Sequence, residues 1–268
     1  MQIMGILNVT PDSFSDGGAY IEIDQALVQA KKMLAQGATI IDVGGETTRP
    51  GAQPVTSEVE IQRVIPVVQA LSKLNCEISI DTYKADVARA AVQAGATYIN
   101  DVSGALYDTQ MAAVAAELGV HIILMHNHFA EGETPHAKKK SAPYQDLYQD
   151  VKERLMKSVE VCLQAGVKPE KIILDPGIGF AKTAEDTVTL LTHLSQLCAE
   201  LDYPILLGTS RKRFLTTYIS EETQNQRDVA TAVTSICALQ AGCQYVRVHD
   251  VATTQTALHT WKALTTPR

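Results

Sequence analysis

Short apolar stretches recur along the whole chain and alternate with longer segments in which apolar residues follow a helical spacing. The short stretches are rich in β-branched residues and are apolar at consecutive positions, which is typical of strands buried on both faces of a parallel sheet. They lie at residues 3–7, 39–43, 77–80, 97–100, 120–125, 171–174, 204–207 and 245–248. The pattern predicts eight strands in one parallel sheet.

The segments between the strands are rich in alanine, and several of them end at a glycine. Glycine is favoured just after a helix because it adopts the left-handed backbone conformation that closes the last turn. These glycines are Gly37, Gly95, Gly119, Gly166 and Gly242. The repeating unit is therefore expected to be a helix, a glycine turn, a strand and a polar loop.

Eight such units in 268 residues match the size of one α/β fold, the (β/α)8 TIM barrel. We expect a single domain, residues 1–268, because no linker or low-complexity segment interrupts the pattern. An open doubly wound sheet is the alternative, but eight parallel strands of that kind usually need a longer chain and an antiparallel edge. The one long irregular stretch, residues 128–144, is predicted to be a surface loop.

Polar residues follow every predicted strand, and a barrel gathers such residues at its carboxyl-end mouth, where barrel enzymes place their active sites. Asp and Asn after a strand also cap helices, and this simpler interpretation is preferred for Asp42 and Asp101. Asp175 precedes Pro-Gly and cannot begin a helix at once, so a functional role is favoured there. The polar residues are Asn8, Asp42, Glu46, Asp81, Asn100, Asp101, His126, Asp175, Ser210, Lys212, Arg247 and His249.

These residues fall into two chemical groups. Asp81, Asn100 and Asp175 offer acceptors and one amide, which suit a flat heterocycle with adjacent N–H donors. A second group, Arg49, Arg247 and His249, offers donors that suit a phosphate or diphosphate, and Lys212 fits either group. The sequence therefore predicts a substrate with a donor-rich ring at one end and an anionic tail at the other.

Composition narrows the range of partners. The net charge of −7 argues against nucleic acid, which selects basic surfaces. The five cysteines form no CxxC pair and are odd in number, which favours a reducing, cytoplasmic location. No signal sequence or membrane-spanning apolar run is present, so no membrane association is expected.

Several motifs indicate other functions only weakly. The GxG at 177–179 lacks the third glycine of a dinucleotide fingerprint, and neither a phosphate-binding P-loop nor a GxSxG serine motif occurs. His126 and His128 have the spacing of a metal pair, which would suit a zinc hydrolase, but no matching acidic ligand is evident. A packed His126 with an exposed His128 is the alternative. Lys138–Lys140 is expected to be a solvated loop, and Trp261 to pack a final helix against the barrel.

Seven segments together resemble the dihydropteroate synthases: 8–18, 44–52, 79–88, 99–104, 175–180, 208–214 and 246–251. The resemblance implies a TIM-barrel transferase of folate biosynthesis. Such an enzyme joins 6-hydroxymethyl-7,8-dihydropterin diphosphate to p-aminobenzoate by an SN1-like substitution, releases diphosphate and is a target of sulfonamides. It also implies Mg2+ as cofactor and a homodimer.

The resemblance assigns roles to individual residues. Pterin-binding residues are Asp81, Asn100, Asp175, Lys212 and Arg247, of which Asp81, Asp175, Lys212 and Arg247 are also expected to be catalytic. Diphosphate-binding residues are Asn8, Arg49, Arg247 and His249, with Asn8 acting through Mg2+. Residues expected to contact p-aminobenzoate are Phe14, Asp16, Thr48, Arg49, Pro50, Phe180 and Ser210.

Two other functions stay open on the sequence alone. The related methyltetrahydrofolate methyltransferases share the pterin-binding acids, so a pterin-binding methyltransferase domain is one alternative. A pterin-binding module without catalysis is the other.

The first polar loop is expected to act as a lid hinged at Gly17 and Gly18. The stretch after Met125 departs from the family pattern, so no roles are transferred there.

Overall fold

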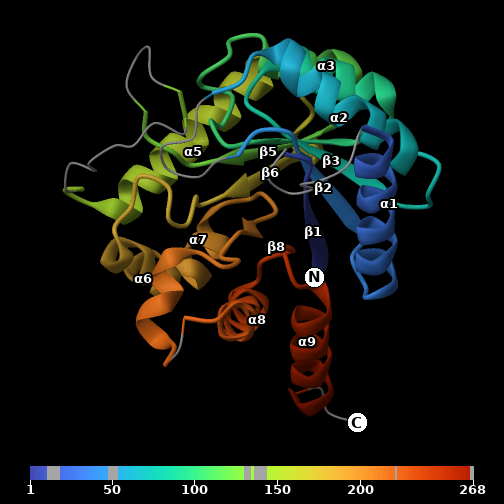
Figure 1. Cartoon of the computed structure of the whole chain (residues 1–268). Helices are drawn as coiled ribbons and strands as arrows, with labels where there is room; N and C mark the ends of the chain where they lie inside the picture. The colour runs from blue at the N-terminus through green and yellow to red at the C-terminus, as the bar shows by residue number, and fades with distance from the viewer. Residues whose placement is uncertain (11–18, 48–53, 130–133, 136–143, 221, 266–268) are drawn as a thin grey trace.

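The computed structural model describes residues 1–10, 19–47, 54–129, 134–135, 144–220 and 222–265 (Figure 1). Eight parallel strands form one sheet in the order β6-β5-β4-β3-β2-β1-β8-β7. A bridge between Leu174 and Ile205 joins β6 to the segment that leads into β7, so the sheet closes on itself. The strands are β1 Gln2–Asn8, β2 Ile40–Gly44, β3 Glu77–Asp81, β4 Tyr98–Asp101, β5 His121–Met125, β6 Ile172–Asp175, β7 Leu206–Leu207 and β8 Tyr245–Val248. The predicted TIM barrel is confirmed.

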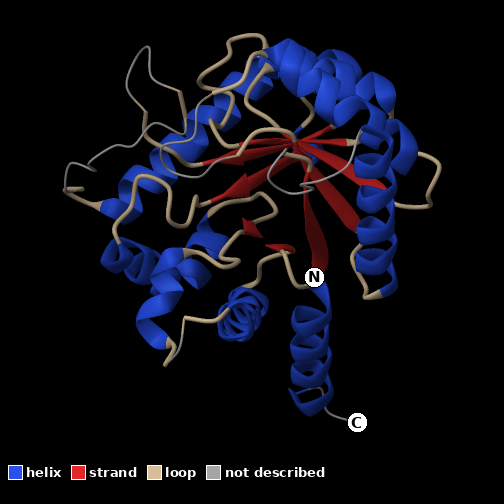
Figure 2. Cartoon of the chain, in the orientation of Figure 1, coloured by secondary structure: helices blue, strands red, loops and turns tan. Residues whose placement is uncertain are grey.

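Helices surround the strands in the described residues (Figure 2). They are α1 Ala19–Ala35, α2 Ser57–Leu71, α3 Ala85–Ala94, α4 Met111–Leu118, α5 Leu147–Gln164, α6 Ala184–Thr192, α7 Leu194–Glu200, α8 Gln224–Ala241 and α9 Val251–Thr265. Short 3-10 turns cover Pro169–Lys171 and Arg213–Tyr218. Among the described helices, none combines the length and apolar character that crossing a bilayer requires.

The glycines predicted to end helices all have positive φ. Because a side chain at such a φ is strained, glycine fits these turns best. The φ values are 107° for Gly37, 124° for Gly95, 67° for Gly119, 95° for Gly166 and 96° for Gly242. The predicted unit of helix, glycine turn and strand is therefore confirmed.

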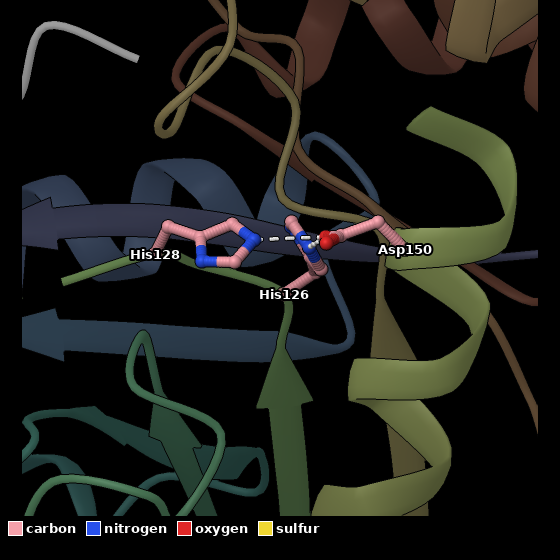
Figure 3. A group of neighbouring side chains, drawn as sticks. All are labelled: His126, His128 and Asp150. Atoms are coloured by element: carbon pink, nitrogen blue, oxygen red, sulfur yellow. Dashed lines mark hydrogen bonds and ion pairs between the residues drawn. The ribbon is translucent and has the colours of Figure 1, made fainter. Parts of the chain in front are cut away.

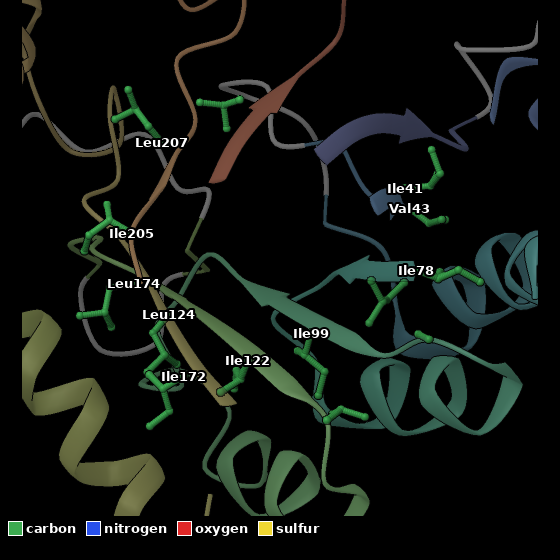
Figure 4. Close-up of a cluster of buried hydrophobic side chains, with 14 of the residues drawn as sticks. Ile41, Val43, Ile78, Ile99, Ile122, Leu124, Ile172, Leu174, Ile205 and Leu207 are labelled. Atoms are coloured by element: carbon green, nitrogen blue, oxygen red, sulfur yellow. The ribbon is translucent and has the colours of Figure 1, made fainter. Parts of the chain in front are cut away.

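The strands carry two apolar faces. Alternate residues such as Ile41, Ile99 and Leu124 belong to a large cluster shared with the helices (Figure 4). Seven strands each give one residue to a smaller cluster inside the barrel: Met4, Ile40, Tyr98, Ile123, Ile173, Leu206 and Tyr245. Burial on both faces accounts for the unbroken apolar runs in the sequence.

Polar residues begin two positions beyond this inner cluster. Because side chains alternate along a strand, residue i+2 returns to the interior one layer closer to the carboxyl end. This layer contains Asp42, Asn100, Asp175 and Arg247, which follow Ile40, Tyr98, Ile173 and Tyr245. An apolar layer therefore lies directly beneath a polar layer.

Two sequence predictions need comment. The predicted long loop falls mostly on residues 130–133 and 136–143, which lie outside the described residues, as does Lys138–Lys140. α9 buries Val251, Thr254 and Leu258, and Trp261, three positions after Leu258, is partly buried. Because residues three and four positions apart lie on one face of a helix, Trp261 continues this buried stripe, and its packing of the last helix against the barrel stays a prediction.

Candidate active site

Arg247 lies at the centre of a cluster of charges in the mouth of the barrel. Its Nε donates to Asp42 Oδ2 at 2.5 Å, and its Nη2 donates to Asp81 Oδ2 at 2.5 Å. Asp42 is fully buried within β2, so the prediction that it caps a helix is wrong. A carboxylate at this depth is tolerated because a guanidinium neutralises it.

Asn100 joins the same cluster. Its Nδ2 donates to Asp42 Oδ2 at 3.2 Å, so Asp42 orients both Asn100 and Arg247. The next residue, Asp101, points elsewhere and accepts from the backbone N–H groups of Ser103 and Ala105. Because α4 begins only at Met111, Asp101 caps a turn, and the prediction of a helix cap is wrong here too. Burial raises the pKa of Asp101 to about 6.

Asp175 ends β6 and starts the loop that continues through Phe180. Its Oδ1 accepts from Gly177 N at 2.7 Å. Gly177 has φ of 69°, and a Cβ placed on it would lie 1.9 Å from the carbonyl oxygen of His126. Only glycine allows the loop to pass so close to the end of β5. The loop conformation in turn holds Asp175 in the mouth.

Lys212 contacts the loop that follows Asp175. Its Nζ donates to the carbonyl of Ile178 and lies 4.7 Å from the centre of the Phe180 ring. A Cβ on Gly208 would lie 3.6 Å from Asp175 Oδ2 and 3.9 Å from Lys212 Nζ, so both charged groups border the same bare backbone. Lys212 and Asp175 therefore face one space beside the Arg247 cluster.

The charges in this cluster have shifted pKa values. Burial raises the pKa of Asp81 to about 7 even though Arg247 opposes that shift. Burial also raises the pKa of Asp175, against the effects of Lys212 and Gly177 N–H. Burial lowers the pKa of Lys212 to about 8. It would lower that of Arg247 as well, but Asp42 and Asp81 outweigh it and raise the pKa.

Ser210 and His249 form a second group at the ends of β7 and β8. Ser210 Oγ lies 2.9 Å from His249 Nδ1 and accepts from His249 N at 3.0 Å. Between Ser210 and Lys212, Arg211 has φ of 57° and is held by an ion pair with Asp228 at 2.6 Å. This strained turn aims Ser210 and Lys212 at the mouth.

Asn8 lies at the carboxyl end of β1, one strand from Asp81. A Cβ on the intervening Gly44 would lie 3.4 Å from Asn8 Oδ1 and 3.7 Å from Asp81 Oδ2. Two side-chain oxygens thus lie on either side of Gly44, which has no side chain of its own. Oxygen is the ligand type that Mg2+ prefers. The structure therefore brings Asn8 beside the Arg247 cluster.

Glu46, the other polar residue after β2, belongs to a separate network. It accepts from the Tyr83 hydroxyl at 3.1 Å and pairs with Lys84, which also contacts Glu60 at 2.6 Å. This network ties the second loop to α2 and α3. The predicted residues Phe14, Asp16, Thr48, Arg49 and Pro50, and the predicted hinge at Gly17 and Gly18, lie outside the described residues.

Four side chains behind the site form a hydrogen-bonded chain, of which only the histidine pair was predicted from the sequence. Lys182 Nζ donates to His126 Nδ1 at 2.7 Å, and Asp150 Oδ1 accepts from Nε2 of His126 at 3.0 Å and of His128 at 2.8 Å (Figure 3). Asp150 comes from α5, more than twenty residues after His128, so no spacing rule links them. The acidic partner that the His-x-His motif lacked in the sequence is thus supplied by the fold.

Gly177→Ala is expected to destabilise the protein. The added methyl group meets a backbone oxygen that cannot rotate away, and the positive φ adds strain, together costing about 1 to 3 kcal/mol. Thermal unfolding should show a lower Tm. Gly119→Ala is the matched control, because Gly119 has φ of 67° but nothing within 4 Å of the added methyl. Equal Tm values for the two variants would contradict the argument from close approach.

The fold and the cluster define a class: a TIM barrel whose carboxyl-end mouth presents buried acids, an amide and cations to a small molecule. A model of the pterin binding enzymes matches residues 4–249. The chain belongs to the pterin binding enzyme family.

Similar proteins of high identity are dihydropteroate synthases. A dihydropteroate synthase from Bacillus subtilis is 50% identical over 250 residues, covering 93% of this chain and 83% of that protein. A solved dihydropteroate synthase from Clostridium difficile, in the presence of pteroic acid, has TM-score 0.90 and 43% identity over 98% of this chain and 96% of that one. One from Xanthomonas albilineans with 4-aminobenzoic acid has TM-score 0.89 and 40% identity, over 99% and 94%.

Proposed function

We propose that this protein is a transferase with dihydropteroate synthase activity. It joins 6-hydroxymethyl-7,8-dihydropterin diphosphate to p-aminobenzoate and releases 7,8-dihydropteroate and diphosphate. The observation that carries the proposal is the meeting of Asp42, Asp81, Asn100 and Arg247 in one buried cluster, with Asp175 and Lys212 beside it. The relatives of high identity and near-complete coverage point to the same activity.

The pterin is recognised by the acids and the amide. Asp175 Oδ2 has no role in the loop turn, since Oδ1 accepts from Gly177 N, so it can accept from the amino group and ring N–H of the pterin. Asn100 offers its amide oxygen while its Nδ2 is held by Asp42. Lys212 offers N–H groups to the acceptor edge of the ring. The apolar layer beneath them supports the flat ring.

The diphosphate is placed against the cations. Arg247 uses Nε and Nη2 for the two acids, which leaves Nη1 to donate to a phosphate oxygen. His249, positioned by Ser210, adds a second donor. Arg49 is assigned to this group from the sequence. Together these donors stabilise the charge that develops on the leaving group.

Mg2+ is the proposed cofactor. Asn8 Oδ1, with Asp81 nearby, fits an ion that takes one or two protein oxygens and completes its shell with waters and phosphates. When bound, Mg2+ supplies positive charge that offsets the charge of the diphosphate.

The chemical step needs no nucleophile from the protein. The bond between the pterin methylene carbon and the bridging diphosphate oxygen breaks, and its electron pair leaves with the diphosphate. The resulting cation is stabilised by the nearby carboxylates of Asp81 and Asp175. The amine of p-aminobenzoate then bonds to the methylene carbon and loses one proton to water. Phe180 and Ser210 are assigned to p-aminobenzoate from the sequence; Phe180 contacts Lys212, and Ser210 contacts His249, which supports a position next to the pterin and the diphosphate.

A coupled assay for dihydropteroate and diphosphate tests the activity. With both substrates and Mg2+, the two products are expected in equal amounts. Pterin binding without turnover would instead support a binding module. Methyl transfer from a methyltetrahydrofolate without diphosphate release would support the methyltransferase alternative.

The pH profile of kcat/KM is expected to be bell-shaped. Activity should fall below about pH 7 as Asp81 becomes protonated and releases Arg247, and above about pH 8 as Lys212 loses its charge. Because arginine stays charged, Lys212→Arg should shift the alkaline limb to higher pH while leaving the acid limb in place. Steady-state rates between pH 5 and 10 check this; an alkaline limb that Lys212→Arg does not move would exclude Lys212 as its origin.

Sulfonamides are expected to inhibit the enzyme in competition with p-aminobenzoate. They share its arylamine and present a sulfonyl group where the carboxylate would be, so they fit the same rim. The apparent KM for p-aminobenzoate should rise with drug concentration while kcat stays constant. Inhibition that excess p-aminobenzoate fails to relieve would place the drug elsewhere.

We further propose that the enzyme works in the cytoplasm as a homodimer. Support for the dimer comes from an exposed stripe on α8 formed by Val229 and Val233, which are 55% and 56% exposed, with Cys237 one turn further. Sedimentation should show a dimer that Val233→Asp converts to monomer. Free thiols at all five cysteines suit a reducing compartment.

A further inference from the structure

Three side chains outside the Arg247 cluster converge on one point beside α5. One ring nitrogen of His126, one of His128 and one carboxylate oxygen of Asp150 all lie within 4.8 Å of one another. In Figure 3 the two imidazoles follow β5, and Asp150 reaches toward them from α5. His126 is buried, whereas His128 and Asp150 have side chains 33% and 35% exposed. The group is thus anchored on one side and open to solvent on the other.

We propose that His126, His128 and Asp150 bind a divalent transition metal ion such as Zn2+. Two imidazoles and one carboxylate are the ligand set that Zn2+, Co2+ and Ni2+ accept, whereas Mg2+ takes oxygen ligands. The open side leaves a fourth position for water. This site is separate from the Mg2+ site proposed at Asn8, and it rests on neither that site nor the proposed activity.

The geometry requires only a small adjustment. Metal–ligand bonds of about 2.0 to 2.2 Å place tetrahedral ligands roughly 3.3 Å apart. Asp150 Oδ1 lies 3.0 Å from His126 Nε2 and 2.8 Å from His128 Nε2, so an ion would lengthen these two contacts by about 0.3 and 0.5 Å, and the two imidazoles, whose ligand nitrogens lie within 4.8 Å of each other, would adjust to the same spacing. The partly exposed His128 and Asp150 are free to make this movement, while His126 stays in place.

Lys182 fixes which nitrogen of His126 faces the ion. Because its ammonium donates to Nδ1, Nε2 carries the proton that is donated to Asp150 in the metal-free protein. A metal ion that binds Nε2 displaces this proton to water, while the proton between Nδ1 and Lys182 stays in their hydrogen bond. Lys182 also donates to the carbonyls of Gly177 and Phe180, so it is itself held in place. Such a partner orients a metal-binding histidine.

Two positive groups set the strength of binding. Lys182 lies behind His126, and Arg154 lies one turn beyond Asp150 on α5. Both side chains repel a bound metal ion. We therefore expect a Kd for Zn2+ that is roughly micromolar, which is weaker than that of structural zinc sites. The ion would tie the end of β5 to α5.

Calorimetric titration of the full chain with Zn2+ tests the proposal. The experiment uses a Cys237→Ser background, because Cys237 is an exposed thiol that would itself bind Zn2+. We expect one ion per chain and the release of about one proton, measured from the dependence of the heat on buffer ionisation enthalpy. Co2+ should show the intense visible absorption of tetrahedral coordination, and Mg2+ should not compete.

Variants of the two partly exposed ligands avoid disturbing the core. His128→Gln and Asp150→Asn should each weaken Zn2+ binding by roughly tenfold or more. His193→Gln and His259→Gln, which remove exposed histidines between α6 and α7 and on α9, should leave it unchanged. Circular dichroism and Tm establish that each variant is folded. We take a Kd of roughly 1 mM as the upper limit of a specific site. The proposal would be overturned if the Cys237→Ser parent bound Zn2+ more weakly than this. It would also be overturned if folded His128→Gln and Asp150→Asn bound Zn2+ as tightly as the parent.

Discussion

Arg247→Ala should lower kcat/KM by about ten- to a hundred-fold or more. The guanidinium supplies a charge-assisted contact worth about 1.5 to 3 kcal/mol to the leaving group. It also compensates Asp42 and Asp81, whose side chains are 0% and 11% exposed. Removing it leaves two buried acids without their cation, so stability should fall by about 3 kcal/mol or more. Steady-state kinetics and thermal unfolding measure the two effects.

A pair of control variants separates these effects. Arg247→Lys keeps the charge but cannot donate to both acids in the same fork, so it should recover more stability than activity. Arg89→Ala removes an arginine that pairs with Glu117 at the surface, and both quantities should stay near the wild type. Wild-type turnover by a folded Arg247→Ala protein would remove Arg247 from the reaction.

Asp175→Asn should weaken pterin binding by about ten- to a hundred-fold, while p-aminobenzoate binding changes much less. The substitution keeps the shape and an oxygen for Gly177 N–H, so the loop conformation should persist. It removes the charge that pairs with the pterin N–H donors, a contact worth about 1.5 to 3 kcal/mol. Calorimetry with a pterin and, separately, with p-aminobenzoate in the presence of diphosphate and a pterin measures both affinities.

Asp202→Asn is the matched control for this experiment. Asp202 is exposed between α7 and β7, and its substitution should change neither affinity. Equal loss of both ligands in Asp175→Asn would mean that the variant disturbs the whole mouth, and the assignment of Asp175 to the pterin would then be wrong.

The sequence predicts the barrel well because its signals are local. Strands such as β1, β5 and β6 contain a run of consecutive apolar residues, and the helices that end at Gly95 and Gly242 carry their own stop signal. The polar residues after the strands could also be gathered in advance, since the closure of a parallel sheet brings strand ends together. Arg247, Asp81 and Asn100 meet for this reason, despite wide separation along the chain.

Contacts that depend on how deeply a side chain is buried, or on the direction in which it points, cannot be predicted from the sequence. The identity of Asp42 and its position after an apolar run fit both a helix cap and a site residue, and only the inward direction of its side chain distinguishes the two. Asp150 meets His126 and His128 because α5 packs beside β5, which no spacing in the sequence encodes. Lys182 is likewise buried by a loop whose course depends on Gly177.

The apolar layer inside the barrel, formed by residues such as Met4, Ile123 and Leu206, has a consequence for molecular traffic. Because these side chains fill the interior of the barrel beneath the polar residues, we expect ligands to enter from the carboxyl end of the strands. Asn100 and Asp175 end β4 and β6, whereas Phe180 and Ser210 lie in the loops that follow β6 and β7. If the pterin binds at the first pair and p-aminobenzoate at the second, we expect the pterin to bind first.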